Sequence, residues 1–124
     1  MPLYSTLRLI AMSTLLVACA APIRSNPNDF KLVAKGQIQT SKVQPFADCL
    51  MDGLREALVT TTYTFKQERR TEGIRVEQLA SSFIGMSADV NNDGSVALYE
   101  SKAMGLVDTK PEINVFTGCT DRYK

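Results

Sequence analysis

Apolar residues recur at intervals of three and four between Pro45 and Val59, which is the spacing that places side chains on one face of an α-helix. Pro45 suits the first turn of that helix, where its missing amide proton leaves no intrahelical bond unmade. Asp48, Asp52 and Glu56 fall on the other side, where we expect a solvated face rather than paired catalytic carboxylates. The predicted apolar face consists of Phe46, Cys49, Leu50, Leu54, Ala57 and Leu58.

Alternation of apolar and polar residues after this helix predicts β-strands. The segments with this pattern are 60–65, 74–80, 84–90 and 96–98. The charged segment 67–73 is expected to be a connection, with Arg69 and Arg70 solvated rather than bound to an anion.

A second helix is predicted near the C-terminus, because Thr109 and Glu112 have the Thr-x-x-Glu spacing of a capping box. Its inward side would present Ile113, Phe116, Thr120 and Tyr123, with Cys119 adjacent. The expected fold is therefore α+β: a helix, an antiparallel sheet of three to four strands with a hairpin at residues 84–100, and a C-terminal helix.

Residues 89–100 satisfy the formula of an EF-hand calcium loop. The ligands in that interpretation are Asp89, Asn91, Asp93, the Ser95 carbonyl and Glu100, with Gly94 at the sharp turn. An EF-hand loop follows a helix with apolar residues one, four, five and eight positions before it. Those positions hold Ala88, Gly85, Ile84 and Ser81, which is a poor helix face.

A β-hairpin explains the same residues better. A three-residue loop over 92–94, with Gly94 in the left-handed conformation, pairs apolar Val90 with Val96. In this register Asp89 and Glu100 lie about 10 Å apart along the strands and on opposite faces. We expect the hairpin and no metal, and we keep calcium binding as the alternative.

Composition narrows the possible functions. The 124 residues, 44% of them hydrophobic, suit one small domain, and the chain contains no histidine, the commonest general base and a frequent metal ligand. Lys and Arg number 14 against 13 Asp and Glu, which argues against nucleic-acid binding. The longest apolar stretch, Leu9 to Ala21, is shorter than the roughly 20 residues of a membrane-spanning helix.

The N-terminus carries one basic residue, Arg8, then an apolar stretch that ends in Leu16-Val17-Ala18-Cys19. This order is typical of a secretory signal, and it closely resembles the lipoprotein signal of Gram-negative bacteria at all four positions of its lipobox. The resemblance implies a signal peptide over 1–18 and a covalent lipid on Cys19. Ala20, in place of an aspartate, implies the periplasmic face of the outer membrane.

The polar segment 19–44 is expected to be a lipidated N-terminus and flexible tether with a reach of roughly 25 to 30 Å, or to include a short strand over 31–39. The domain would then occupy 45–124. With Cys19 lipidated, an oxidising envelope favours a disulfide between Cys49 and Cys119. Two free thiols or a link to a partner are the alternatives.

The stretch from Phe46 to Tyr123 also resembles small proteobacterial envelope lipoproteins of unassigned function. The residues that carry this likeness are Ala88-Asp89-Val90, the segment 93–101, and a cysteine near each end. This resemblance implies a fold but no enzymatic activity. We therefore expect a non-enzymatic interaction or structural module with an envelope protein as partner; a calcium-binding module and a hydrolase are the weaker alternatives.

Overall fold

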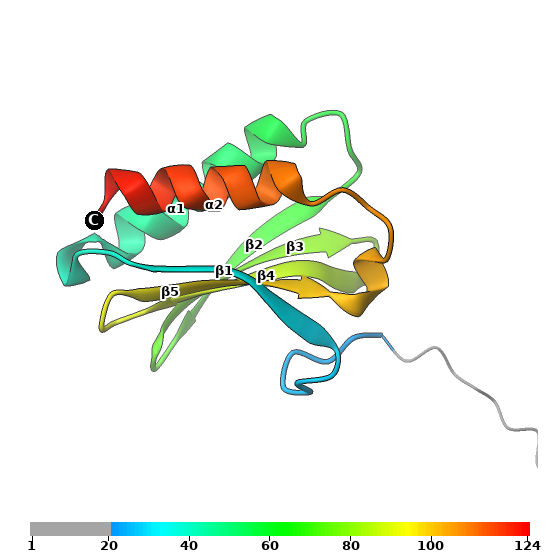
Figure 1. Ribbon diagram of the computed structural model, residues 1–124, viewed down its shortest axis with the longest axis horizontal. Coiled ribbons are helices and arrows are strands. Elements are labelled where there is room, and N and C mark those ends of the chain that lie inside the picture. The colour runs from blue at the N-terminus through cyan, green and yellow to red at the C-terminus, as the bar shows by residue number, and fades with distance from the viewer. Residues whose placement is uncertain (1–20) are drawn as a thin grey trace, which may run out of the picture.

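A five-stranded antiparallel sheet with two helices on one of its faces makes up residues 21–124, the part of the chain that the computed structural model describes (Figure 1). The strands lie in the order β1-β5-β4-β3-β2. Their bounds are β1 Phe30–Gln37, β2 Thr64–Arg70, β3 Gly73–Ala80, β4 Phe83–Asn91 and β5 Ser95–Ser101. The helices are α1 Val43–Ala57 and α2 Lys110–Arg122, with the short 3-10 turns η1 Thr40–Lys42 and η2 Lys102–Met104.

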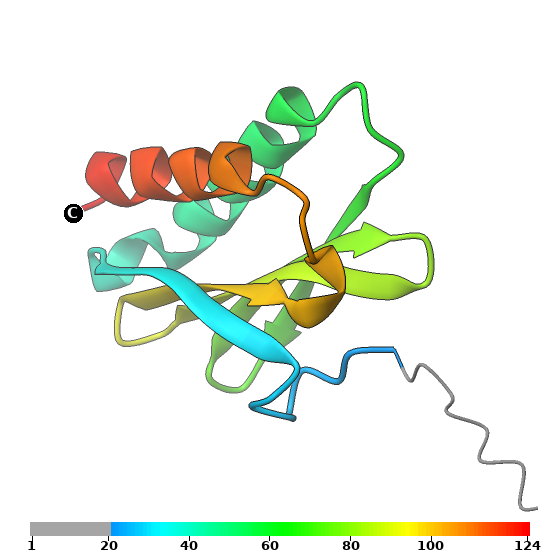
Figure 2. The ribbon, with the colours of Figure 1, turned by 45° about the vertical axis from the view of Figure 1, so that its right-hand side comes forward.

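The path of the chain explains this strand order. Helix α1 carries the chain from β1, at one edge of the sheet, to β2 at the other, and a meander of four strands then returns to β5 beside β1. Both helices lie on the same side of the sheet in two views (Figure 1, Figure 2). The α+β class is thus confirmed, but the sheet has five strands rather than the three to four expected.

The extra strand is β1, which lies inside the segment predicted to be a flexible tether. Residues 30–37 are not a flexible tether, and the alternative of a short strand over 31–39 is confirmed, since they pair with β5 from Phe30 opposite Ser101 to Gln37 opposite Ser95. The register shifts between Leu32 and Ala34, and such a bulge places two consecutive residues where alternation requires one. The period of two that would have marked the strand is therefore broken.

The position of β2 was also predicted wrongly. It spans Thr64–Arg70 rather than residues 60–65. Residues 67–70, which were expected to belong to a charged connection, form more than half of this strand. Charged side chains are common on an edge strand, where they discourage pairing with other chains. Arg69 and Arg70 are exposed on this strand, and the turn at Thr71 and Glu72 leads directly into β3.

The hairpin of β4 and β5 has the predicted register. Val90 is opposite Val96, and Ala88 is opposite Leu98, with all four side chains buried. Gly94 adopts a φ of 84°, a conformation that glycine takes without steric cost. A β-carbon at this position would collide with the carbonyl oxygen of Ile38, so both the turn and its packing require glycine.

Helix α1 buries Phe46, Ala47, Leu50 and Leu54, as its apolar period predicted, although Ala57 is exposed. Helix α2 begins where expected, after Thr109, but the predicted capping box does not form, since Thr109 makes no side-chain cap bond. Its hydroxyl instead donates to Glu100 Oε1 at 2.8 Å. Glu112 is buried, because it faces the sheet rather than the open end of the helix.

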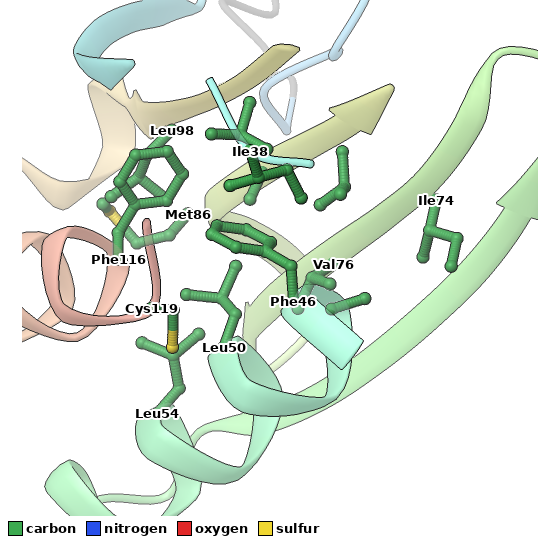
Figure 3. Close-up of a cluster of buried hydrophobic side chains, with 14 of the residues drawn as sticks. Ile38, Phe46, Leu50, Leu54, Ile74, Val76, Met86, Leu98, Phe116 and Cys119 are labelled. Carbon is green, nitrogen blue, oxygen red and sulfur yellow. The ribbon is translucent and has the colours of Figure 1, made fainter. Parts of the chain in front are cut away.

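The core lies between the helices and the sheet (Figure 3). Phe46 of α1 meets Phe116 of α2 edge to face, with ring centroids 5.7 Å apart, a favourable aromatic geometry. The helices approach closely because Gly53 has no side chain; a β-carbon there would lie 2.5 Å from Val115 Cγ1.

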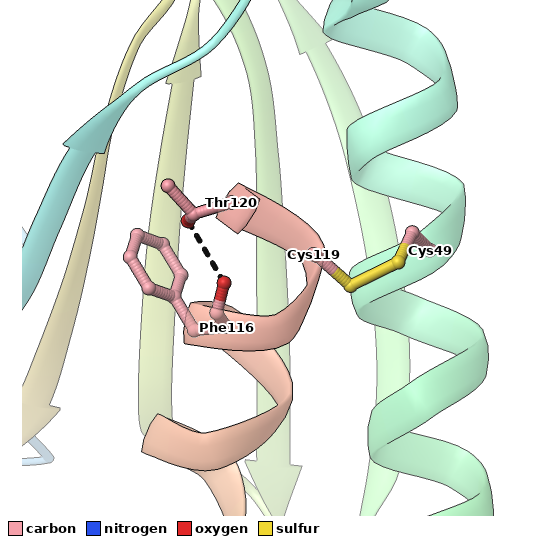
Figure 4. The surroundings of a disulfide bond; sticks show 4 residues. All are labelled: Cys49, Phe116, Cys119 and Thr120. Atoms are coloured by element: carbon pink, nitrogen blue, oxygen red, sulfur yellow. Dashed lines mark hydrogen bonds between the residues drawn. A yellow bond between two sulfur atoms is a disulfide. The ribbon is translucent and has the colours of Figure 1, made fainter. Parts of the chain in front are cut away.

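The predicted disulfide between Cys49 and Cys119 is confirmed (Figure 4). It links α1 to α2 across a sequence separation of 70, with the two Cα atoms 6.0 Å apart. Thr120, the residue after Cys119, donates its hydroxyl proton to the Phe116 carbonyl oxygen at 2.8 Å. The disulfide therefore fastens together the two helices that cover the sheet.

Candidate functional site: the uncovered face of the sheet

No helix covers the sheet face opposite α1 and α2 in residues 21–124 (Figure 1), although Ser87 and Glu77 on this face are buried. Strand register places its side chains in two rows across all five strands, and we call these two rows the open face. The first row contains Leu32, Tyr99, Ser87, Glu77 and Lys66. The second contains Lys35, Ala97, Asp89, Arg75 and Glu68.

Asp89 is the centre of the charge network on the open face. Its Oδ2 accepts a hydrogen bond from Arg24 Nη2 at 2.6 Å, and its Oδ1 accepts one from Arg75 Nε at 2.8 Å. Arg70 Nη1 lies 4.0 Å from Oδ1. Hydrogen bonds between charged groups are shorter and stronger than neutral ones. Asp89 is therefore held by cations from three separate segments of the chain.

Arg24 lies over this face from the segment that precedes β1. Its guanidinium carbon is 3.9 Å from the ring centroid of Tyr99 and 5.5 Å from that of Phe30, which is close enough for cation-π attraction. Its Nε also donates to Ser87 Oγ at 3.0 Å. No pattern in the sequence indicates this role, since Arg24 lies in a polar segment without periodicity.

Positive charge exceeds negative charge on this surface. Lys66 Nζ pairs at 3.2 Å with Glu77, whose side chain is almost completely buried, so that pair is largely structural. The cationic side chains of the face and its margin are Arg24, Lys35, Lys66, Arg70 and Arg75, and the anionic ones are Glu68, Glu72, Glu77 and Asp89, so the excess is one positive charge. The excess suits a partner with an acidic surface.

The residues of the alternative calcium loop do not converge in this structure. Asp89 points to the open face, whereas Glu100 pairs with Met86 on the side of the helices. Asp93 Oδ1 is already used, since it accepts from the Ser95 amide at 2.9 Å and the Ser95 hydroxyl at 2.6 Å. These bonds hold the pKa of Asp93 below its usual value. Asn91 donates to the Ser95 hydroxyl at 3.0 Å.

A second polar cluster lies at one end of the core, under the first turn of α2. Glu112 is 2% exposed, and its Oε2 has no hydrogen-bond partner. Burial, with smaller contributions from the nearby carboxylates of Asp108 and Glu100, raises the pKa of Glu112 to about 7. On the same side of the sheet, Gln78 is buried with both amide atoms unpartnered. The sequence pattern did not predict that either side chain is buried, because their burial depends on how α2 and β3 pack.

Within residues 21–124, no group of three or more acidic or cysteine side chains is arranged to hold a metal ion. No helix in the same range is both long and apolar enough to cross a bilayer. Cys19, the predicted lipidation site, and the predicted signal over 1–18 lie outside the described residues. No protein-family model matches this chain, and neither a curated protein nor a solved structure matches it.

Proposed function

We propose that this protein is an envelope lipoprotein, anchored through a lipid on Cys19 to the periplasmic face of the outer membrane. The support is the likeness of Leu16-Val17-Ala18-Cys19 to a lipobox. A disulfide between Cys49 and Cys119 accords with an oxidising compartment.

Labelling with palmitate tests the anchor. The full chain is expected to incorporate label and to sediment with the outer membrane, and a Cys19→Ser variant is expected to do neither. Equal incorporation by the two proteins, or none by either, would refute the anchor.

We further propose that the anchored domain is a non-enzymatic interaction module whose open face binds an envelope protein with an acidic surface. The observation that carries this proposal is the uncovered sheet face with its cationic excess, held in register by the bonds at Asp89. Lys35 and Glu68 belong to this face and are exposed at its two edges. The lack of histidine makes acid-base catalysis a weaker interpretation.

Site-specific photo-crosslinking in intact cells tests the interaction. A photoreactive residue at Lys35 or Glu68 is expected to capture the same partner, whereas one at Asp52, exposed on α1, is expected to capture none. A Lys35→Glu substitution should reduce the amount of partner captured by a photoreactive residue at position 68. The substitution reverses a charge on the binding face without breaking an ion pair of the fold. The matched control is Arg55→Glu, which reverses an exposed charge on α1. Equal capture of the partner from the open face and from position 52 would refute the proposal. So would an equal loss of capture in the Lys35→Glu and Arg55→Glu variants.

A further inference from the structure

The folded part of the chain begins very close to Cys19. The backbone amide of Ile23 donates to Asp29 Oδ2 at 2.8 Å, and Arg24 is fastened to Asp89. Ile23 lies four positions after Cys19, and a fully extended chain spans at most about 3.3–3.6 Å per residue, or about 14 Å in all. The domain therefore cannot move far from a lipid on Cys19, in contrast to the long tether expected from the sequence.

Asp29 connects this entry point to the segment after β5. Lys102 donates its backbone amide to the Asp29 carbonyl oxygen at 2.9 Å, and its Nζ lies 2.6 Å from Asp29 Oδ1. The hydrogen bond from Ile23 and then that from Lys102 hold the pKa of Asp29 below its usual value. Asp29, Lys102 and Gly105 line one shallow pocket, and both views show residues 21–29 and η2 at the same end of the domain (Figure 1, Figure 2).

Apolar side chains are exposed at this same end. Leu106 is fully exposed and Val107 is 49% exposed, on the loop between η2 and α2, and Ile23 is 57% exposed beside the entry point. The loop has a defined shape, since the Val107 amide donates to the Met104 carbonyl oxygen at 2.8 Å. Two adjacent aliphatic residues at the tip of a loop are unfavourable in water, and burying them in an apolar phase is favourable.

We propose that this end of the domain contacts the lipid bilayer, with Leu106 and Val107 entering the boundary between head groups and acyl chains. The inference rests on the proposed lipid anchor, because the short connection to Cys19 selects this surface. The exposed side of α1 then stays free for other contacts. The domain has one fixed orientation on the membrane.

Tryptophan fluorescence tests the orientation, since the chain contains no tryptophan. Leu106→Trp places one reporter on the loop, and Val59→Trp places a matched reporter at another exposed aliphatic position, on the loop after α1. Neither side chain belongs to the core, so both variants should fold. Each is expressed as the full chain, purified with its lipid, and reconstituted in vesicles of phosphatidylethanolamine and phosphatidylglycerol with or without brominated acyl chains.

Brominated lipid is expected to reduce the emission of Trp introduced at Leu106 by about half or more, because interfacial side chains lie about 5–10 Å into the boundary region. Emission from the Val59→Trp variant should not change. Anchored protein in which both reporters respond equally, or neither responds, would overturn this inference alone. Protein that carries no lipid would instead refute the proposed anchor, and with it the orientation.

Discussion

Replacing Glu112 by glutamine should stabilise the protein above neutral pH and have little effect near pH 5. Glu112 is buried in the folded state with a pKa of about 7, against an ordinary value of 4.5. Its position in the first turn of α2 would favour the charged form through the helix dipole, but the loss of water and the nearby carboxylates outweigh that effect. The side chain is therefore more easily protonated in the folded state than in the unfolded one.

The sign of the pH dependence follows from this difference. Below pH 4.5 the carboxyl is protonated in both states, and the folded protein has the full stability that this site allows. As pH rises from 4.5 to about 7 the unfolded state releases its proton first, so stability falls, and above about 7 the loss is constant. One pKa unit corresponds to about 1.4 kcal/mol, so the rise from 4.5 to about 7 gives at most about 3.5 kcal/mol, or about 2 kcal/mol after solvent screening is allowed for.

Urea unfolding of the wild type and of Glu112→Gln at pH 5, 6, 7 and 8 measures the effect. The difference in unfolding free energy between the two proteins should grow by about 2 kcal/mol from pH 5 to pH 8, since other titrating groups cancel in the comparison. Glu56→Gln, which removes an exposed carboxylate on α1, is the control and should stay within about 0.5 kcal/mol of wild type. A difference for Glu112→Gln that does not depend on pH would refute the reasoning.

Three further predictions follow from the structure. Reduction of the Cys49 and Cys119 disulfide should lower the unfolding free energy by about 4 kcal/mol, because it releases a closed loop of 70 residues; thermal melts with and without reductant measure this. Gln78→Met should stabilise the fold by about 1–3 kcal/mol, since it removes two buried polar atoms without partners at similar volume, as urea unfolding will show. Calorimetric titration with calcium should give no heat of binding, because Asp89 and Glu100 lie on opposite faces.

Each of these has a control and a contradicting result. A Cys49→Ser and Cys119→Ser double variant should melt as the reduced protein does and ignore reductant; an unchanged melting temperature in reduced wild type would contradict the loop argument. A Gln78→Met variant less stable than wild type would show that the amide has partners in solution. Saturable calcium binding that is lost in Asp93→Ala would restore the EF-hand interpretation.

Local pattern was sufficient for the elements that are amphipathic by themselves. The stripe containing Phe46, Leu50 and Leu54 predicted α1, and strict alternation from Ile84 to Val90 predicted β4. The Asn-Asp-Gly turn gave the register of the hairpin, because a loop of given length and type leaves one way to pair its strands. The disulfide followed from having two cysteines left to pair once Cys19 was assigned to the lipid.

The tertiary structure decided what depends on distant partners. β1 is a strand because β5, 58 to 71 positions further along the chain, forms hydrogen bonds with it. The bulge in β1 hides the period of two in the sequence. β2 is a strand at an edge where charge is tolerated, and Arg24 is fixed only because Asp89 and Tyr99 meet it from two other strands. Glu112 is buried because the disulfide and Phe116 hold its helix against the sheet. Amphipathic period is a property of neighbours along the chain, whereas edge position, burial of a charge and the partner of an arginine are set by contacts that exist only after folding.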